Sequence, residues 1–244
     1  GTDNTLVGWK EDFNISLDID IPSQKEAVKY LESVYKALNK KMRVGGHSKG
    51  GNLAMYASIF CKEEIKKEII EVYNNDGPGL SKEIVMGEIY KNALGKIKSF
   101  IPQTSIIGKL MYHEEKYYIV KSTQKGIMQH DLYSWQIEGK DFVYLKEITN
   151  ESEFVDEVIK EWTTKFTPKQ RSEFINIVYE ILKETNSETI YEMSKNRFKT
   201  VGALIKAYHS TNKKNKQIIS QTLLELFGIT KNNAFKKIDE KLKK

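Results

Sequence analysis

The sequence has one cysteine, Cys61, among its 244 residues. A single thiol excludes disulfides within the chain and any metal site that needs several cysteines. Because Cys61 ends an apolar stretch, we expect it to pack as a small buried hydrophobic residue. The sequence also lacks a secretion signal and any apolar run long enough to cross a membrane. These absences predict a cytoplasmic protein.

Acidic residues are scarce in the C-terminal part of the chain. The formal net charge is +6, but residues 195–244 carry 13 Lys and Arg residues against 3 Asp and Glu. Such a basic tail favours acidic partners. It contains almost no arginine, few interleaved aromatics and no recognised motif, which argues against nucleic acid. The remaining alternatives are a solvated lysine face and a helix that lies on an anionic membrane surface.

Hydrophobic patterning divides the chain into two regions. In residues 1–148 strand-like stretches alternate with helical ones, which predicts an α/β domain with a mainly parallel sheet and helices on both faces. The expected strands cover residues 41–45, 69–75, 97–101, 117–122 and 142–145, and the expected helices cover 24–38, 51–60 and 81–93. Residues 149–244 have little glycine and predict a helical C-terminal subdomain. There, Thr167 precedes Pro168 as a helix cap.

Residues 46–50 read Gly-His-Ser-Lys-Gly, with Ser48 at the centre. They lie between the strand-like residues 41–45 and the helical residues 51–60. Strand, G-x-S-x-G and helix together are typical of a nucleophile elbow, which raises the serine hydroxyl above the sheet. The tight turn predicts that only small residues fit at its two glycines. It also directs the backbone amide of Lys49 toward a developing oxyanion. The alternative is a glycine-rich turn with a solvated serine.

A nucleophilic serine needs a base, and the chain has four histidines. His130 lies on a loop beyond the strand-like residues 117–122, which is where a serine–histidine–acid arrangement places its base. His113, in a charged turn, is the reserve. A surface histidine is the alternative for both. We expect His47, inside the elbow, to support the elbow backbone or to pack as a ring, and His209 lies on a lysine-rich helix.

The acid that orients the base is expected between the serine and the histidine. Asp76 follows the strand-like residues 69–75, and functional groups gather at the carboxyl ends of parallel strands. The alternative is an ordinary turn, since Asp-Gly-Pro-Gly is a common turn sequence. Glu114 and Glu115 compete for the role but lie in a predicted solvated turn. Asp131 is adjacent to the predicted base and is badly placed to orient it.

Four short blocks resemble a known family. They read Gly-His-Ser-Lys-Gly-Gly-Asn-Leu-Ala (46–54), Asn-Asp-Gly-Pro-Gly (75–79), Ile-Pro-Gln-Thr-Ser (101–105) and Gly-Ile-Met-Gln-His-Asp (126–131). Over about residues 1–135 the chain resembles a bacterial family of unknown function in the α/β-hydrolase superfamily, related to class 3 lipases. The resemblance implies an α/β-hydrolase fold and lipase-like chemistry. Fungal-type lipases carry their acid in the region that here reads 100–105 without a carboxylate, which leaves Asp76 as the acid.

The first residues resemble the start of the class 3 lipase signature. Gly1-Thr2 is followed by Trp9 and Asp12. The resemblance implies that Thr2 supplies a second amide to the oxyanion, beside that of Lys49. It also makes Gly1 the end of a strand, so we expect a preceding strand to be missing from this chain.

These observations predict a serine hydrolase of lipase or esterase type. Ser48 is the expected nucleophile, His130 the base and Asp76 the orienting acid, acting on a lipid or small-molecule acyl ester without cofactor or metal. Two alternatives remain. One is a catalytically silent binding or scaffold protein that keeps the fold. The other is an interaction module that contacts anionic lipid through the basic tail.

Overall fold

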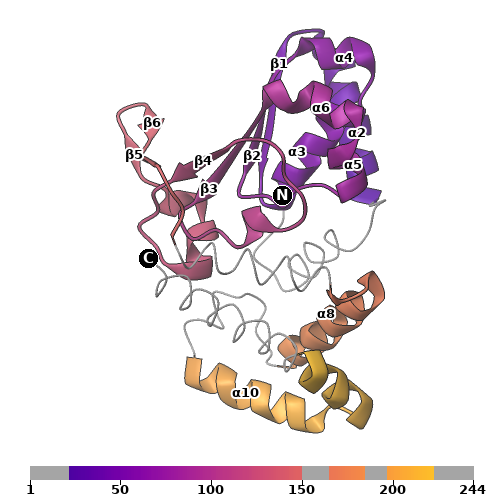
Figure 1. Ribbon diagram of the computed structural model, residues 1–244, viewed down its shortest axis with the longest axis vertical. Coiled ribbons are helices and arrows are strands. Elements are labelled where there is room, and N and C mark those ends of the chain that lie inside the picture. The colour runs from indigo at the N-terminus through magenta and orange to yellow at the C-terminus, as the bar shows by residue number, and fades with distance from the viewer. Residues whose placement is uncertain (1–21, 150–164, 185–196, 223–244) are drawn as a thin grey trace, which may run out of the picture. The chain divides into compact units, whose positions relative to one another are not determined.

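The computed structural model describes residues 22–149, 165–184 and 197–222 (Figure 1). The described residues fall into two compact units. Residues 22–149 belong to the first, which contains the sheet, and the helical residues from 165 onward belong to the second.

The first unit is built on a five-stranded sheet. Its order is β1 (Met42–His47), β2 (Ile69–Asn75), β3 (Ile97–Pro102), β4 (Tyr117–Val120) and β7 (Tyr144–Leu145). The first four strands are parallel, and β7 runs antiparallel to β4. A separate hairpin pairs β5 (Ile137–Glu138) with β6 (Asp141–Phe142). The unit is therefore α/β with a mostly parallel sheet, and the carboxyl ends of its parallel strands meet at one edge.

The helices of this unit are α2 (Pro22–Leu38), α3 (Lys49–Phe60), α4 (Glu63–Glu68), α5 (Lys82–Met86) and α6 (Glu88–Ala93). Figure 1 shows them on one side of the sheet. They share one hydrophobic cluster with the sheet, in which Met55, Val72 and Tyr90 are almost completely buried. Helices were expected on both faces, whereas within residues 22–149 they cover one.

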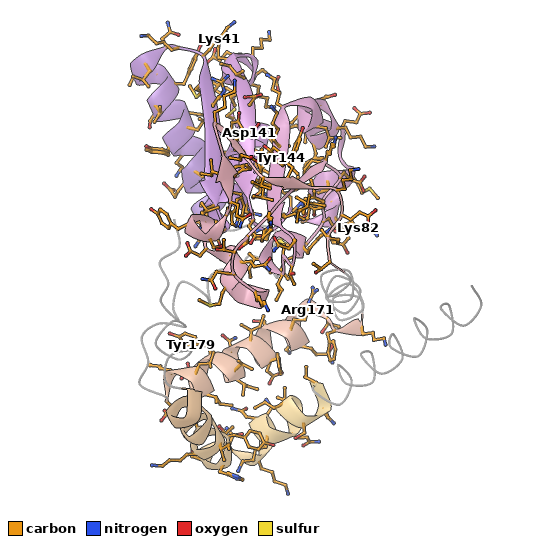
Figure 2. All side chains as sticks on the ribbon, turned by 90° about the vertical axis from the view of Figure 1, so that its left-hand side faces the viewer. Lys41, Lys82, Asp141, Tyr144, Arg171 and Tyr179 are labelled. Carbon is orange, nitrogen blue, oxygen red and sulfur yellow. The ribbon has the colours of Figure 1, made fainter. Side chains whose placement is uncertain are left out.

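The opposite face of the sheet carries aromatic side chains. Tyr73, Phe100 and Tyr118 come from neighbouring strands, and the rings of Phe100 and Tyr118 stack with centroids 5.1 Å apart. Figure 2 faces this side and shows Asp141 beside Tyr144, whose hydroxyl donates a 2.8 Å hydrogen bond to Oδ1 of Asp141. Because side chains alternate along a strand, Val72 of β2 packs with the helices and its neighbour Tyr73 lies on the aromatic face.

Some helix boundaries differ from the prediction, and α3 begins at Lys49 instead of Gly51. The helix expected over residues 81–93 is interrupted at Gly87, whose extended backbone (φ −75°, ψ 150°) separates α5 from α6. The first helix begins at Pro22, ahead of Ser23, because proline is compatible with the first helical turn, where no backbone donor is needed. Short 3-10 turns complete the unit: η1 (Leu94–Lys96), η2 (Ile107–Lys109), η3 (Gly126–His130) and η4 (Leu132–Ser134).

The second unit contains α8 (Pro168–Lys183), α10 (Arg197–Ser210) and further helical residues at 213–222. The predicted cap is confirmed, since the Thr167 side chain and Gln170 form a capping box at the start of α8. The helix expected near residues 154–162 and the end of the basic tail, 223–244, lie outside the described residues. Among those described, no helix has the length and apolar character needed to cross a membrane.

Candidate active site

Ser48 lies in a tight turn between β1 and α3. Its φ of 57° and ψ of −130° are unusual for a residue with a side chain. Neighbouring backbone holds it there, since the Ser48 amide donates to the Asn75 carbonyl at 3.0 Å and the Ser48 carbonyl accepts from Gly51 at 2.9 Å. Ser48 occupies the N-cap position of α3, yet its side chain does not cap the helix. The turn instead directs the hydroxyl toward His130.

The two glycines of the turn have different roles. A Cβ at Gly46 would lie 2.2 Å from the backbone of Gly50, so only glycine fits there. A Cβ at Gly50 would meet no described atom within 4 Å. The prediction that both positions must be small is therefore correct for Gly46 and wrong for Gly50. The backbone of Gly50 lies against Gly46, but a side chain at position 50 would not disturb this contact.

His130 lies between the other two predicted residues. Its Nε2 is 2.9 Å from Oγ of Ser48, and its Nδ1 is 2.7 Å from Oδ2 of Asp76. An ionised carboxylate only accepts hydrogen bonds, so Nδ1 carries the ring proton. That leaves Nε2 of the neutral ring as the acceptor for the serine hydroxyl. The arrangement joins residues 82 and 54 positions apart in the sequence.

Asp76 directly follows β2 and is 1% exposed. Its φ of 49° is also in the left-handed region, and its amide is held by the carbonyl of Phe100 at 2.7 Å. Oδ1 accepts hydrogen bonds from Oγ of Ser105 at 2.5 Å and from the amide of Gly108 at 3.1 Å. With His130 on Oδ2, the buried side chain of Asp76 makes three hydrogen bonds, which fix its orientation.

Sequence reasoning missed Ser105 and Gly108. The stretch 100–105 was noted for lacking a carboxylate, and its last residue proves to be a hydrogen-bond donor to Asp76. A Cβ at Gly108 would lie 2.5 Å from Oδ1 of the same carboxylate. Neither role leaves a local pattern, because each depends on a partner about 30 residues away.

His47 packs against His130 from the end of β1. Its Nε2 is 2.8 Å from the backbone carbonyl oxygen of His130, and the two ring centroids are 4.4 Å apart. The expected packed ring is present, but its hydrogen bond supports the His130 turn and not the elbow backbone. Burial lowers the pKa of His47, and the neighbouring His130 lowers it further. His47 is therefore a neutral ring that donates through Nε2.

His113, the reserve base, lies elsewhere. Its Nδ1 is 2.8 Å from Oε1 of Glu115 and its Nε2 is 3.1 Å from the carbonyl of Leu110. Glu115 also accepts from the hydroxyls of Ser99 and Tyr90. The predicted solvated turn is correct for Glu114, which is exposed, and wrong for Glu115, because the side chains of His113 and Glu115 are 5% and 1% exposed. These residues form a buried structural network that does not include Ser48.

The ring nitrogens of His113 lie within hydrogen-bond distance of Oε1 of Glu115 and of the carbonyl oxygen of Leu110. Burial alone would raise the pKa of Glu115. Hydrogen bonds from His113, Ser99 and Tyr90 and the charge of His113 outweigh burial and lower the pKa to about 2. Glu115 is thus a buried carboxylate whose charge is stabilised by its hydrogen-bond donors.

The other residues that the sequence analysis named lie at several places in the chain. Lys49 is the first residue of α3, and Thr2 lies outside the described residues. His209 is on α10 in the second unit, and Asp131 caps η4 by accepting from the amide of Tyr133 at 3.0 Å. Cys61 is buried, and burial raises the pKa of its thiol to about 11. Within the described parts of the chain, no three or more His, Cys, Asp or Glu side chains are grouped to hold a metal ion.

Comparison with known proteins gives one match. A family model described as Mbeg1-like matches residues 1–180, which is most of the chain and includes the whole Ser48–His130–Asp76 arrangement. Comparison with curated proteins found no match, and comparison with solved structures found none either.

Proposed function

The chain belongs to the Mbeg1-like family, which is lipase-like, and on that premise we propose that it is a serine hydrolase of the α/β-hydrolase fold. The observation that carries the proposal is the continuous hydrogen-bond chain from Oγ of Ser48 through His130 to Asp76. A hydroxyl is a weak nucleophile at neutral pH, and this geometry supplies the base that activates it. The strained φ of Ser48 adds support, since such strain is concentrated at functional sites.

In the first half of the proposed reaction, Oγ of Ser48 attacks the acyl carbonyl carbon. The hydroxyl proton passes to Nε2 of His130, and Asp76 stabilises the resulting imidazolium through Nδ1. The tetrahedral intermediate then collapses, and the bond to the alcohol oxygen breaks. His130 returns its proton to that oxygen, so an alcohol leaves and an acyl group remains on Ser48.

In the second half, the oxygen of a water molecule attacks the acyl carbon, and His130 takes a proton from that water. The new tetrahedral intermediate breaks its bond to Oγ, which recovers the proton from His130. The net reaction is an ester plus water giving an acid and an alcohol. Ser48, His130 and Asp76 return to their starting states.

The negatively charged oxygen of each intermediate needs hydrogen-bond donors. We assign the backbone amide of Lys49 to this role, because Lys49 opens α3 immediately after the nucleophile, where the helix dipole also favours negative charge. The amide of Thr2 is the proposed second donor, on the basis of the family resemblance. One such donor typically contributes ~3 kcal/mol to the transition state.

An acyl ester of a lipid or small molecule is the proposed substrate, and this choice rests on the lipase-like family. The alternative of a silent scaffold is disfavoured by the hydrogen bonds that Asp76 receives, since a scaffold has no need for a buried, oriented carboxylate beside a serine. Contact of the basic tail with anionic membranes stays a prediction, because residues 223–244 lie outside the described chain.

The decisive experiment is intact-mass spectrometry after incubation with a fluorophosphonate. We expect one adduct on the wild type and none on Ser48→Ala, with strongly slowed labelling of His130→Ala. Ser33→Ala is the matched control, because its hydroxyl bonds only the Tyr30 carbonyl on the exposed side of α2. No adduct on the folded wild type, or an adduct that persists in Ser48→Ala, would reject the proposal. A panel of ester, thioester and amide substrates then defines the bond that is cleaved.

A further inference from the structure

His47 contacts the proposed base through both its ring and its hydrogen bond. Its Nε2 donates to the carbonyl oxygen of His130 at 2.8 Å, and the two ring centroids are 4.4 Å apart at an interplanar angle of 37°. His47 is the last residue of β1, and His130 is the last residue of η3. A residue adjacent to the nucleophile thus holds the backbone of the base.

The hydrogen bond acts on a single peptide group. The carbonyl of His130 belongs to the same planar unit as the amide of Asp131, which donates to the carbonyl of Met128 at 3.3 Å. Two hydrogen bonds therefore restrain this peptide plane. The bond from His47 is the shorter of the two. The direction of the His130 side chain follows from the orientation of its backbone. Holding the plane therefore limits movement of the backbone from which the His130 ring extends, while Asp76 orients the ring itself through Nδ1.

Charge at this contact matters as well. The charges that act on His47 are those of His130, Asp76 and Asp131. Burial lowers the pKa of His47 and so does His130, while the His130 carbonyl and the two aspartates act in the opposite direction. The ring is thus neutral when His130 accepts the serine proton, and the new imidazolium has no like charge stacked against it.

We propose that His47 is a positioning residue for the Ser48 reaction, holding His130 in register with the serine hydroxyl by its hydrogen bond to the His130 carbonyl. The kinetic part of this inference rests on the proposed function. The structural part, the hold on the His130 peptide plane, does not. A displacement of His130 of about 1 Å is expected to slow the reaction by about 100-fold.

Two near-isosteric substitutions separate the hydrogen bond from the bulk of the ring. Glutamine can present an amide donor at about the position of Nε2, whereas methionine has a similar length and no donor. We expect His47→Met to be labelled by a fluorophosphonate about 10-fold to 100-fold more slowly than the wild type and His47→Gln to recover most of the rate. His47→Leu is a second donor-free variant if His47→Met is unstable. His209→Gln, on α10, is the control for loss of a histidine.

The exchange rate of the Asp131 amide, measured by NMR on the same proteins, reports on the peptide plane without any chemistry at Ser48. Faster exchange in His47→Met than in the wild type and in His47→Gln supports the proposal. Wild-type labelling and exchange in His47→Met would overturn it, as would equal impairment of both variants. If the wild type is not labelled but exchange still responds to His47→Met, the proposed hydrolase function fails and the hold on His130 stands.

Discussion

The hydroxyl of Ser105 donates a 2.5 Å hydrogen bond to Oδ1 of Asp76, the carboxylate oxygen that does not contact His130. Ser105 is 1% exposed, and its Oγ also accepts from the amide of Gly108 at 3.1 Å. The serine hydroxyl and this amide both donate to Oδ1 of Asp76, while Oδ2 is left to contact His130. The orientation of His130 therefore depends on residues that do not touch it.

We predict that Ser105→Ala lowers turnover about 10-fold, because a hydrogen bond to a charged group contributes about 1.5–3 kcal/mol. The Gly108 amide remains and limits the loss. The measurement is the rate of fluorophosphonate labelling or ester hydrolysis beside that of Ser33→Ala. An unchanged rate in a folded Ser105→Ala protein would show that Gly108 alone suffices to hold Asp76.

Gly108→Ala is expected to be more damaging. The added Cβ would lie 2.5 Å from Oδ1 of Asp76 and 2.7 Å from Cγ2 of Ile101. Both neighbours are buried, so the carboxylate must move, at a cost of about 1–3 kcal/mol in stability and with loss of its alignment with His130. Thermal unfolding and labelling are measured together. Gly95→Ala is the control, since its Cβ would meet no described atom within 4 Å, and wild-type labelling of Gly108→Ala would contradict the packing argument.

The elbow provides a contrast between two glycines. Gly46→Ala places a Cβ 2.2 Å from the backbone of Gly50, which cannot move without opening the turn around Ser48. We expect a loss of several kcal/mol in the free energy of unfolding, on the order of the larger effects seen for single substitutions. Gly50→Ala meets open space at the start of α3, and its stability should change by at most about 1 kcal/mol, with alanine favoured in the helix. Chemical denaturation compares the two, and equal destabilisation would refute the contrast.

The buried Glu115 network predicts a pH dependence of stability. The pKa of Glu115 is lowered from 4.5 to about 2, so its contribution is fully present above pH 4.5 and is lost as the pH falls toward 2. Glu115→Gln should be less stable than the wild type at neutral pH, by ~3 kcal/mol. The difference should shrink over that acid range as the wild-type carboxylate protonates.

Unfolding temperatures recorded between pH 7 and pH 2 check this prediction. Glu114→Gln is the matched control, because the Glu114 side chain is exposed next to the buried one. A constant difference between Glu115→Gln and the wild type across the whole range would mean that the charge of Glu115 is not the source of the stability.

Local patterns predicted the features that depend on neighbouring residues in the chain. The elbow sequence at 46–50 and the Thr167 cap involve partners a few residues apart, and the strand over residues 69–75 is recognised from its own residue types, so the signals of all three are contained in short windows. The interruption at Gly87 is a partial exception. Glycine weakens a helix without necessarily ending it, and only the structure shows that the backbone at Gly87 is extended.

Tertiary structure decided which of the plausible partners meet. Both His113 and His130 follow the elbow, and both stand near acidic residues in the sequence. Parallel pairing of β1, β2 and β3 brings the ends of those strands to one edge, so Ser48 and Asp76 become neighbours and the turn after β4 adds His130. His113 instead turns inward to a buried Glu115.

The sequence by itself therefore determined the tight turn at Ser48, the mostly parallel α/β architecture and a short set of candidate histidines and acids. Only the folded chain decided that Ser105, Gly108 and His47 support that set, because each acts on a residue that is distant in the sequence. Hydrogen bonds across such separations depend on strand register and side-chain direction. Both are properties of the assembled sheet and leave no periodic trace in the order of residues.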